Sequence, residues 1–239
     1  MTFETNRVIL FDIDGTLVRG SPGRSVFCAA MEEVYGEPGR PELVSFSGKT
    51  DPQIAHELLA LAGVERERVD ALLPEMLARY VELLAEALPD RLPEVLPGIP
   101  DLLYRVAAEE GVEMALLTGN VIDGARIKLG SVGLARFFPF GAFGSDSMDR
   151  NELPAIALER ARSRWGGHLH PSHMVIVGDT PRDVICGRLA GMETVAVATG
   201  QYSLEELADT EADRVFPDLE APGVYDSLVR GGVRLAGTV

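Results

Sequence analysis

Two carboxylates at the end of an apolar run are the first residues in this chain whose types and spacing suggest chemistry. The run covers residues 8–11, and Asp12 and Asp14 follow it with one residue between them. A continuous apolar run is typical of a strand buried on both faces, and Gly15 permits a sharp exit that brings Asp14 beside Asp12. Two carboxylates this close repel each other unless a cation or a shared proton lies between them. The stretch therefore predicts a functional site.

Two other interpretations of Asp12, Asp14 and Thr16 account for less of the sequence. The spacing matches the opening of a calcium-binding EF-hand loop, but the twelfth position of that loop is Gly23 here and not a glutamate. Asp and Thr also favour ordinary turns between a strand and a helix. A turn alone does not explain the buried strand before it or the polar clusters at other strand ends.

A second pair of carboxylates, Asp179 and Asp183, follows another apolar run at residues 174–177. Thr180, with Pro181 next and Asp183 three residues on, also makes a good helix start. Asp183 therefore either binds a metal or only caps its helix, and both remain open. Asp179 has no such structural use. A third carboxylate near Asp12 and Asp14 would complete an oxygen site for Mg²⁺, which takes few protein ligands and keeps waters.

Residues suited to binding a phosphate follow at two further places. Thr118, Gly119 and Asn120 break a third apolar run; such a triplet is usually a turn that begins a helix, but its hydroxyl and backbone N–H groups would suit a phosphate oxygen. Arg150 opens a predicted helix over 152–164, where a positive side chain is mildly unfavourable. A solvated arginine would explain this position, and so would one that faces an anion.

Lysine is rare in this chain, since only Lys49 and Lys128 are lysines among 22 basic residues. Lys49 lies just before a predicted helix, where it is either an ordinary surface lysine or a contact for a substrate. Lys128 lies in the middle of a predicted helix, and we expect it to be solvated. We interpret Cys28 and Cys186 as small buried residues without a disulfide.

The elements that must position these residues alternate between strand and helix outside one all-helical block. Apolar strands that alternate with helices predict a doubly wound parallel sheet, in which ligands bind beyond the carboxyl ends of the strands. The three polar clusters would all lie at that edge. Residues 19–92 contain only helical patterns, with Pro74 expected to divide the last of them into two helices. We therefore predict an α/β core domain formed by residues 1–18 and 93–239, with residues 19–92 inserted as a helical cap domain above the site.

Composition narrows the classes of partner. The formal net charge of −15 argues against a main role in binding nucleic acid or an anionic membrane, because both require a basic surface. No leader-like segment opens the chain and no apolar run approaches 18 residues. We expect a cytoplasmic protein, monomer or homodimer, that acts on a small molecule.

Taken together, the motifs resemble those of the haloacid dehalogenase (HAD) superfamily. The resemblance rests on Asp12-x-Asp14-x-Thr16, on Thr118-Gly119-Asn120 and on the segment from Gly178 to Asp183, each at a strand end and in the family's order. The helical insert resembles the cap of phosphoglycolate phosphatase-like and β-phosphoglucomutase-like members. One departure is that the family's third motif is commonly a lysine, whereas the matching position here is Arg150, which can still bind a phosphate bidentately.

The resemblance implies a role for each site residue. Asp12 would be the nucleophile that forms an aspartyl-phosphate, and Asp14 the general acid and then the base. Mg²⁺ would be held by Asp12, by the backbone carbonyl of Asp14, by Asp179 and by Asp183, directly or through water. The phosphate would be bound by Thr118, Gly119, Asn120 and Arg150, with Lys49 of the cap contacting another anionic group of the substrate.

The resulting expectation is a Mg²⁺-dependent phosphatase acting on a small phosphorylated metabolite. Asp14 argues against the superfamily's dehalogenases and phosphonatases, which lack an aspartate at this position. A β-phosphoglucomutase-like mutase keeps both aspartates and remains open. A non-catalytic regulator that binds Mg²⁺ or phosphate is the third alternative, against which the intact Asp12 and Asp14 speak.

Overall fold

The computed structural model describes residues 6–231, and within them strands and helices alternate along most of the chain. In chain order the elements are β1 (Arg7–Phe11), β2 (Val18–Arg19), α1 (Gly23–Tyr35), α2 (Asp51–Leu61), α3 (Arg66–Ala87), β3 (Glu94–Val95), α4 (Ile99–Ala107), β4 (Val112–Thr118), α5 (Ile122–Ser131), η1 (Ala135–Phe137), β5 (Gly141–Phe143), η2 (Arg150–Glu152), α6 (Leu153–Trp165), η3 (Pro171–His173), β6 (Met174–Gly178), α7 (Pro181–Leu189), β7 (Glu193–Val197), α8 (Leu204–Ala208), β8 (Arg214–Phe216) and α9 (Val224–Arg230).

Six strands form one parallel sheet in the order β5-β4-β1-β6-β7-β8. The strand β1 lies in the middle, paired with β4 on one side and with β6 on the other. Connections leave β1 toward both edges, so the order of strands reverses beside it, which is where ligands bind in sheets of this kind. The predicted doubly wound α/β fold is thereby confirmed.

Side chains of β1 alternate between two apolar layers, one on each face of the sheet. Ile9 and Phe11 belong to a buried cluster that includes residues of α4, α5 and α9. Val8 and Leu10 belong to a second cluster with residues of α6 and α7. All four are fully buried, as a strand covered on both faces requires. This packing holds β1 rigidly and fixes the position at which Asp12 leaves the sheet.

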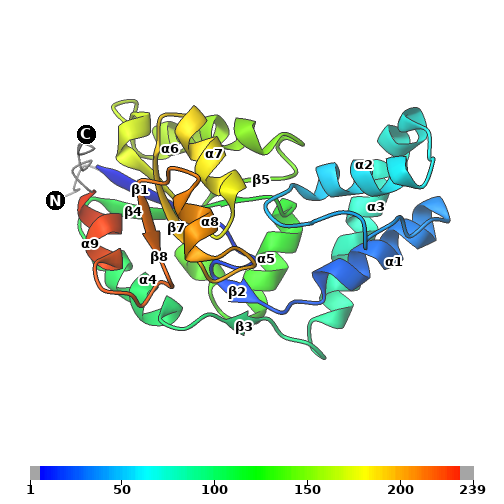
Figure 1. The fold of residues 1–239 in the computed structure, drawn as a ribbon, viewed down its shortest axis with the longest axis horizontal. Helices are drawn as coiled ribbons and strands as arrows, with labels where there is room; N and C mark the ends of the chain where they lie inside the picture. The colour runs from blue at the N-terminus through cyan, green and yellow to red at the C-terminus, as the bar shows by residue number, and fades with distance from the viewer. Residues whose placement is uncertain (1–5, 232–239) are drawn as a thin grey trace.

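The helices α1, α2 and α3 form a separate bundle at one end of the molecule, beside the sheet and not upon it (Figure 1). Their apolar faces pack into a cluster of their own, which includes Phe27, Leu58 and Tyr80 and receives Val121 from the sheet side. The assignment of residues 19–92 as a cap domain agrees with this arrangement and stays a prediction.

The helix α3 corrects one expectation, because it continues through Pro74 without a break. A proline inside a helix removes a hydrogen bond and costs about 3 kcal/mol. Val69 and Met76 are fully buried on either side of it, and each such side chain contributes about 1.5–3 kcal/mol. Packing on both sides of Pro74 therefore outweighs the cost of keeping one helix.

A second difference lies where the chain enters and leaves the helical bundle. The strands β2 and β3 pair antiparallel, Val18 with Val95 and Arg19 with Glu94. Two-residue strands carry no periodic signal, so the sequence did not predict them.

Two smaller findings concern the cysteines and membrane spans. Cys186 is buried as expected, Cys28 is only half-buried, and both are free thiols. Among residues 6–231, no helix combines the length and the apolar character that crossing a bilayer demands.

Candidate active site

The register of the sheet brings the predicted site residues together at its carboxyl edge. Phe11 lies opposite Leu116 of β4 and Val177 of β6. The residues that follow these strands, Asp12 and Asp179, together with the β4 terminus at Thr118, therefore leave the sheet side by side. The backbone N–H of Asp12 donates to the carbonyl of Val177 at 2.9 Å, which extends the pairing to Asp12 itself.

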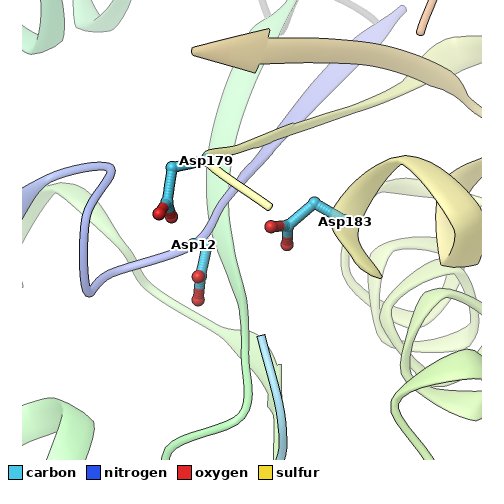
Figure 2. A group of neighbouring side chains, drawn as sticks. All are labelled: Asp12, Asp179 and Asp183. Atoms are coloured by element: carbon cyan, nitrogen blue, oxygen red, sulfur yellow. The ribbon is translucent and has the colours of Figure 1, made fainter. Parts of the chain in front are cut away.

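Three buried carboxylates form one group at this edge (Figure 2). Asp12 follows β1, Asp179 follows β6, and Asp183 lies in the first turn of α7. One carboxylate oxygen from each lies within 4.8 Å of the others. The three residues are 5%, 3% and 2% exposed. Buried carboxylates in such proximity are costly unless a cation or protons neutralise them.

The pKa values record that cost. Burial, together with the nearby charges of Asp183 and Asp12, raises the pKa of Asp179 to about 8. Burial also raises the pKa of Asp12 to about 6, although the guanidinium of Arg150 acts to lower it. At neutral pH the group therefore holds at least part of a proton that a bound cation would displace.

Arg150 is the positive charge built into this group. Its side chain is 4% exposed, its Nη2 lies 3.5 Å from Asp12 Oδ1, and it forms an ion pair with Asp183. With all three carboxylates ionised, three negative charges and this one positive charge leave a net charge of −2. Its buried Nε atom has no hydrogen-bond partner among the described residues, and an anion bound at the site would supply one.

Asp183 caps its helix and also belongs to the acidic group. Its Oδ2 accepts hydrogen bonds from the Thr180 backbone N–H at 3.1 Å and from the Thr180 hydroxyl at 2.7 Å, which closes a capping box at the start of α7. Its Oδ1 faces Arg150. The cap fixes the carboxylate in place beside Asp12 and Asp179, so capping and membership of the acidic group are compatible.

Asp179 is held in a slot made by two glycines. Its Oδ1 accepts from the Thr16 hydroxyl at 3.2 Å. A Cβ atom would lie 2.4 Å from Asp179 Oδ2 at Gly15 and 1.8 Å at Gly200. Gly15 also has a φ of 87°, a conformation that other residues rarely adopt. The glycine predicted to permit a sharp exit from β1 therefore also leaves room for Asp179.

Asp14 lies in a different environment from Asp12. Its side chain is 43% exposed. Its Oδ2 accepts from Asn120 Nδ2 at 2.8 Å and from Lys128 Nζ at 2.7 Å. Lys128 also donates to Asn120 Oδ1 at 2.6 Å. Asn120, predicted to bind phosphate, thus contacts Asp14 and also donates to Thr118 Oγ1 at 2.9 Å.

Lys128 corrects the expectation of a solvated side chain. It is 4% exposed and lies on the inner side of α5. Burial alone lowers the pKa of Lys128, but Asp14, Tyr80 and Asp51 raise it, and the net shift is upward. The ammonium group is therefore charged in the folded protein. Its position gives no periodic signal, and the only hint in the sequence is that lysine is so rare.

A cavity of about 350 Å³ opens in front of Asp12 and Asp14, which is large enough for a small metabolite. Asp179 and Asp183 do not line it. Seven of the predicted site residues line the cavity: Asp12, Asp14, Lys49, Thr118, Gly119, Asn120 and Arg150. The helical bundle adds Phe27, Phe46 and Tyr80.

The helical bundle docks tightly against the Thr118–Asn120 turn. The backbone N–H of Asp51 donates to the carbonyl of Gly119 at 2.8 Å, and Asp51 Oδ2 accepts from the Val121 N–H at 2.8 Å. A Cβ atom on Gly119 would lie 2.0 Å from the carbonyl oxygen of Lys49. Gly119 thus permits the approach of the bundle, a role that the sequence did not suggest.

Lys49 reaches the cavity from this docking segment. Its side chain is 11% exposed and forms an ion pair with Glu57. Both predicted features of Lys49, a position before a helix and a place near the site, are seen in the structure. Its contact with a substrate stays a prediction.

Comparisons with known proteins bear on this geometry. Residues 9–197 match the model of the haloacid dehalogenase-like hydrolase family. The chain is 30% identical over 238 residues to a phosphoglycolate phosphatase of Pseudomonas putida, covering 96% of this chain and 83% of that protein. It is 28% identical to a phosphoglycolate phosphatase of Rhodospirillum rubrum, covering 97% and 96%.

A solved structure supports the same fold. The crystal structure of a hydrolase from Pseudomonas syringae superposes with a TM-score of 0.68 at 19% identity, covering 94% of this chain and 96% of that one. The family match extends from within β1 to the end of β7 and thus includes all three motifs on which the resemblance rested. The polar clusters at the ends of β1, β4 and β6 are therefore those of a family of enzymes, and this chain belongs to the haloacid dehalogenase-like hydrolases.

Proposed function

We propose that this protein is a Mg²⁺-dependent phosphatase that hydrolyses a small-metabolite phosphomonoester through an aspartyl-phosphate. The observation that supports this most is the contrast between two aspartates two residues apart. Asp12 is buried beside Arg150, whereas Asp14 is half exposed to the cavity. A nucleophile held in place and an acid within reach of the leaving group are the two parts that the reaction requires.

In the first step, an oxygen of Asp12 attacks phosphorus and forms a new O–P bond while the bond between phosphorus and the ester oxygen breaks. Asp14 gives its proton to the ester oxygen, so the product leaves as an alcohol and Asp14 becomes a carboxylate. Arg150 and Thr118 line the cavity next to Asp12 and would hold the phosphoryl oxygens during the transfer.

In the second step, water attacks the phosphorus of the aspartyl-phosphate. Asp14 takes a proton from this water, the bond between Asp12 and phosphorus breaks, and inorganic phosphate leaves. Both aspartates are then restored to their starting protonation states, so the cycle balances.

The residues present fit a divalent cation. Asp12, Asp179 and Asp183 offer hard carboxylate oxygens within 4.8 Å of one another, with a net charge of −2 once Arg150 is counted. With the Asp14 backbone carbonyl they would hold Mg²⁺. When bound, the cation supplies positive charge that a phosphate dianion needs here, since each pair of unit charges at ~4 Å is worth ~4 kcal/mol at an effective dielectric of about 20.

The relatives named phosphoglycolate phosphatase favour a small phosphate ester that carries a carboxylate. Lys49 lines the cavity from the helical bundle and is the candidate contact for that second anionic group. We therefore propose 2-phosphoglycolate as the first substrate to test.

The decisive experiment is a hydrolysis screen over small phosphorylated metabolites with Mg²⁺, read out as inorganic phosphate, with Asp12→Asn as the blank. Release of phosphate by the wild type and none by Asp12→Asn is the expected result. Transfer of the phosphoryl group to a sugar without release would indicate a mutase instead. A wild-type protein inert on the whole panel would indicate a regulator without catalysis.

A further inference from the structure

Lys128 is a buried charge that neither the family motifs nor the proposed chemistry assigns to a role. It lies within α5, is 4% exposed, and contacts Asp14 Oδ2 at 2.7 Å and Asn120 Oδ1 at 2.6 Å. Replacing a buried ion pair by apolar residues is often neutral or stabilising in proteins. Stability alone therefore does not account for a lysine at this position, and its partner suggests another reason.

The contacts of Asp14 are one-sided. Oδ2 accepts from both Lys128 and Asn120, at 2.7 Å and 2.8 Å. In the described part of the chain, no donor reaches Oδ1. Because two donors already occupy Oδ2, Oδ1 is the oxygen without a protein contact among residues 6–231. Asp14 lines the cavity and its side chain is 43% exposed, so Oδ1 is the oxygen left to face a substrate.

The ammonium group itself has little freedom to move away. A Cβ atom on Gly23 would lie 3.5 Å from Lys128 Nζ and 3.5 Å from the Tyr80 hydroxyl oxygen. The entry to α1 and the middle of α3 therefore lie beside the ammonium group, at the wall of the cavity. Asn120 is in turn fixed by Thr118 Oγ1 at 2.9 Å. Lys128 and Asn120 together hold the carboxylate of Asp14 in position.

We propose that Lys128 is a positioning residue for Asp14, which holds Oδ2 so that Oδ1 is the oxygen presented to the ester oxygen of the substrate. The proposal rests on the proposed function, in which Asp14 gives its proton to the leaving alcohol. Lys128 itself touches no reacting atom in this arrangement.

The test uses leaving groups that differ in their need for a proton. An alkyl ester such as 2-phosphoglycolate releases an alkoxide unless it is protonated, whereas p-nitrophenyl phosphate releases a stable phenolate. Lys128→Met is compared with the wild type, with Asp14→Asn, with the double variant, and with Arg126→Met as an exposed control on the same helix. The quantities are kcat for 2-phosphoglycolate, with β-glycerophosphate as a second alkyl ester, and the pre-steady-state burst of p-nitrophenol.

We expect Lys128→Met to lower kcat on the alkyl esters by roughly 100-fold, as loss of proton transfer does, and to leave the p-nitrophenol burst rate within about threefold of the wild type. The double variant should be no slower on alkyl esters than Asp14→Asn, since both changes remove one interaction. Equal losses on alkyl and aryl esters, or additive losses in the double variant, would overturn the proposal.

Two outcomes distinguish a failure of the role proposed for Lys128 from a failure of the proposed function on which it rests. If the wild type turns over neither alkyl ester, the proposed chemistry is wrong, and so is this role for Lys128. The same holds if Asp14→Asn loses as much rate on the aryl ester as on the alkyl esters. If Asp14→Asn discriminates and Lys128→Met does not, only the role of Lys128 is wrong. Should Lys128→Met fail to fold in thermal unfolding, Lys128→Gln keeps two hydrogen-bond donors and should lose less activity, with the same selectivity for alkyl esters.

Discussion

Two acidic regions lie at the carboxyl edge of the sheet, and their charge is neutralised in different ways. On one side Asp12, Asp179 and Asp183 have a single guanidinium among them, and burial raises the pKa of Asp179 to about 8. On the other side Asp14 has the ammonium group of Lys128 at 2.7 Å. The first region has room for a further cation, whereas the second contains a cation of its own. Under the proposed function, the first would hold the metal and the second would move protons.

The largest effect expected from this contrast is on activity when divalent cations are removed. Excess chelator should lower the rate by about 10³-fold or more, because a metal contributes several kcal/mol to transition-state stabilisation. Added Mg²⁺ should restore it, as measured by release of inorganic phosphate. Turnover that is unchanged in chelator would mean that the first region needs no cation.

Affinity for Mg²⁺ should rise with pH. This change in affinity should be smaller than the loss of activity in chelator. The cation must displace protons from Asp179 and Asp12, whose pKa values burial raises to about 8 and about 6. Between pH 6 and pH 8 we expect up to roughly tenfold tighter binding per pH unit, measured by calorimetry. Asp14→Asn should show the same dependence, because its side chain lies outside the cluster. An affinity that is flat over this range would contradict the raised pKa values.

The stability of the metal-free protein should respond with opposite signs to changes in the two regions. A carboxyl with a raised pKa contributes most below its ordinary value of 3.8 and loses that contribution as the pH rises through its folded value. Asp179→Asn should therefore raise the free energy of unfolding by about 2–4 kcal/mol at pH 8, and progressively less toward pH 4. Asp14→Asn should lower it by about 1–3 kcal/mol, because it leaves Lys128 buried with a weaker partner.

Urea unfolding in chelator at several pH values measures both changes. Asp123→Asn, on the exposed face of α5, serves as a matched control and should change little. If both variants shifted stability in the same direction, the two regions would not differ as described.

The smallest effect concerns the helical bundle. Lys49→Met should raise KM for 2-phosphoglycolate about tenfold with little change in kcat, since the lysine is proposed to contact the substrate away from the reacting bond. An ester without a second anionic group should not respond to the same change. A fall in kcat with KM unchanged would place Lys49 in the chemistry and not in recognition.

The positions of the main site residues could be predicted because one rule places them. Parallel strands present their carboxyl ends at one edge, so polar residues after three apolar runs had to meet there. Asp12, Thr118 and Asp179 do meet. The rule needs only the strand ends, which the apolar runs at 8–11, 114–117 and 174–177 mark well.

What the sequence did not predict depends on contacts between segments far apart in the chain. Lys128 is 114 residues from Asp14, and nothing in α5 marks its inner face as a place for a charge. The continuity of α3 through Pro74 and the approach of Lys49 to Gly119 likewise depend on packing of the helical bundle. Local propensity describes the secondary structure that a segment prefers in isolation. These features arise from tertiary contacts with other segments.

The short pairing of β2 with β3 has a consequence for engineering. The chain crosses into the helical bundle at Val18–Arg19 and returns at Glu94–Val95, and the two crossings are hydrogen-bonded to each other. The ion pair between Arg19 and Glu94 marks their outer end. The bundle is thus attached by one two-stranded joint and not by two independent linkers. A different helical module grafted beyond Arg19 and Glu94 would inherit this joint, and it would have to replace the contacts that Asp51 makes with Gly119 and Val121.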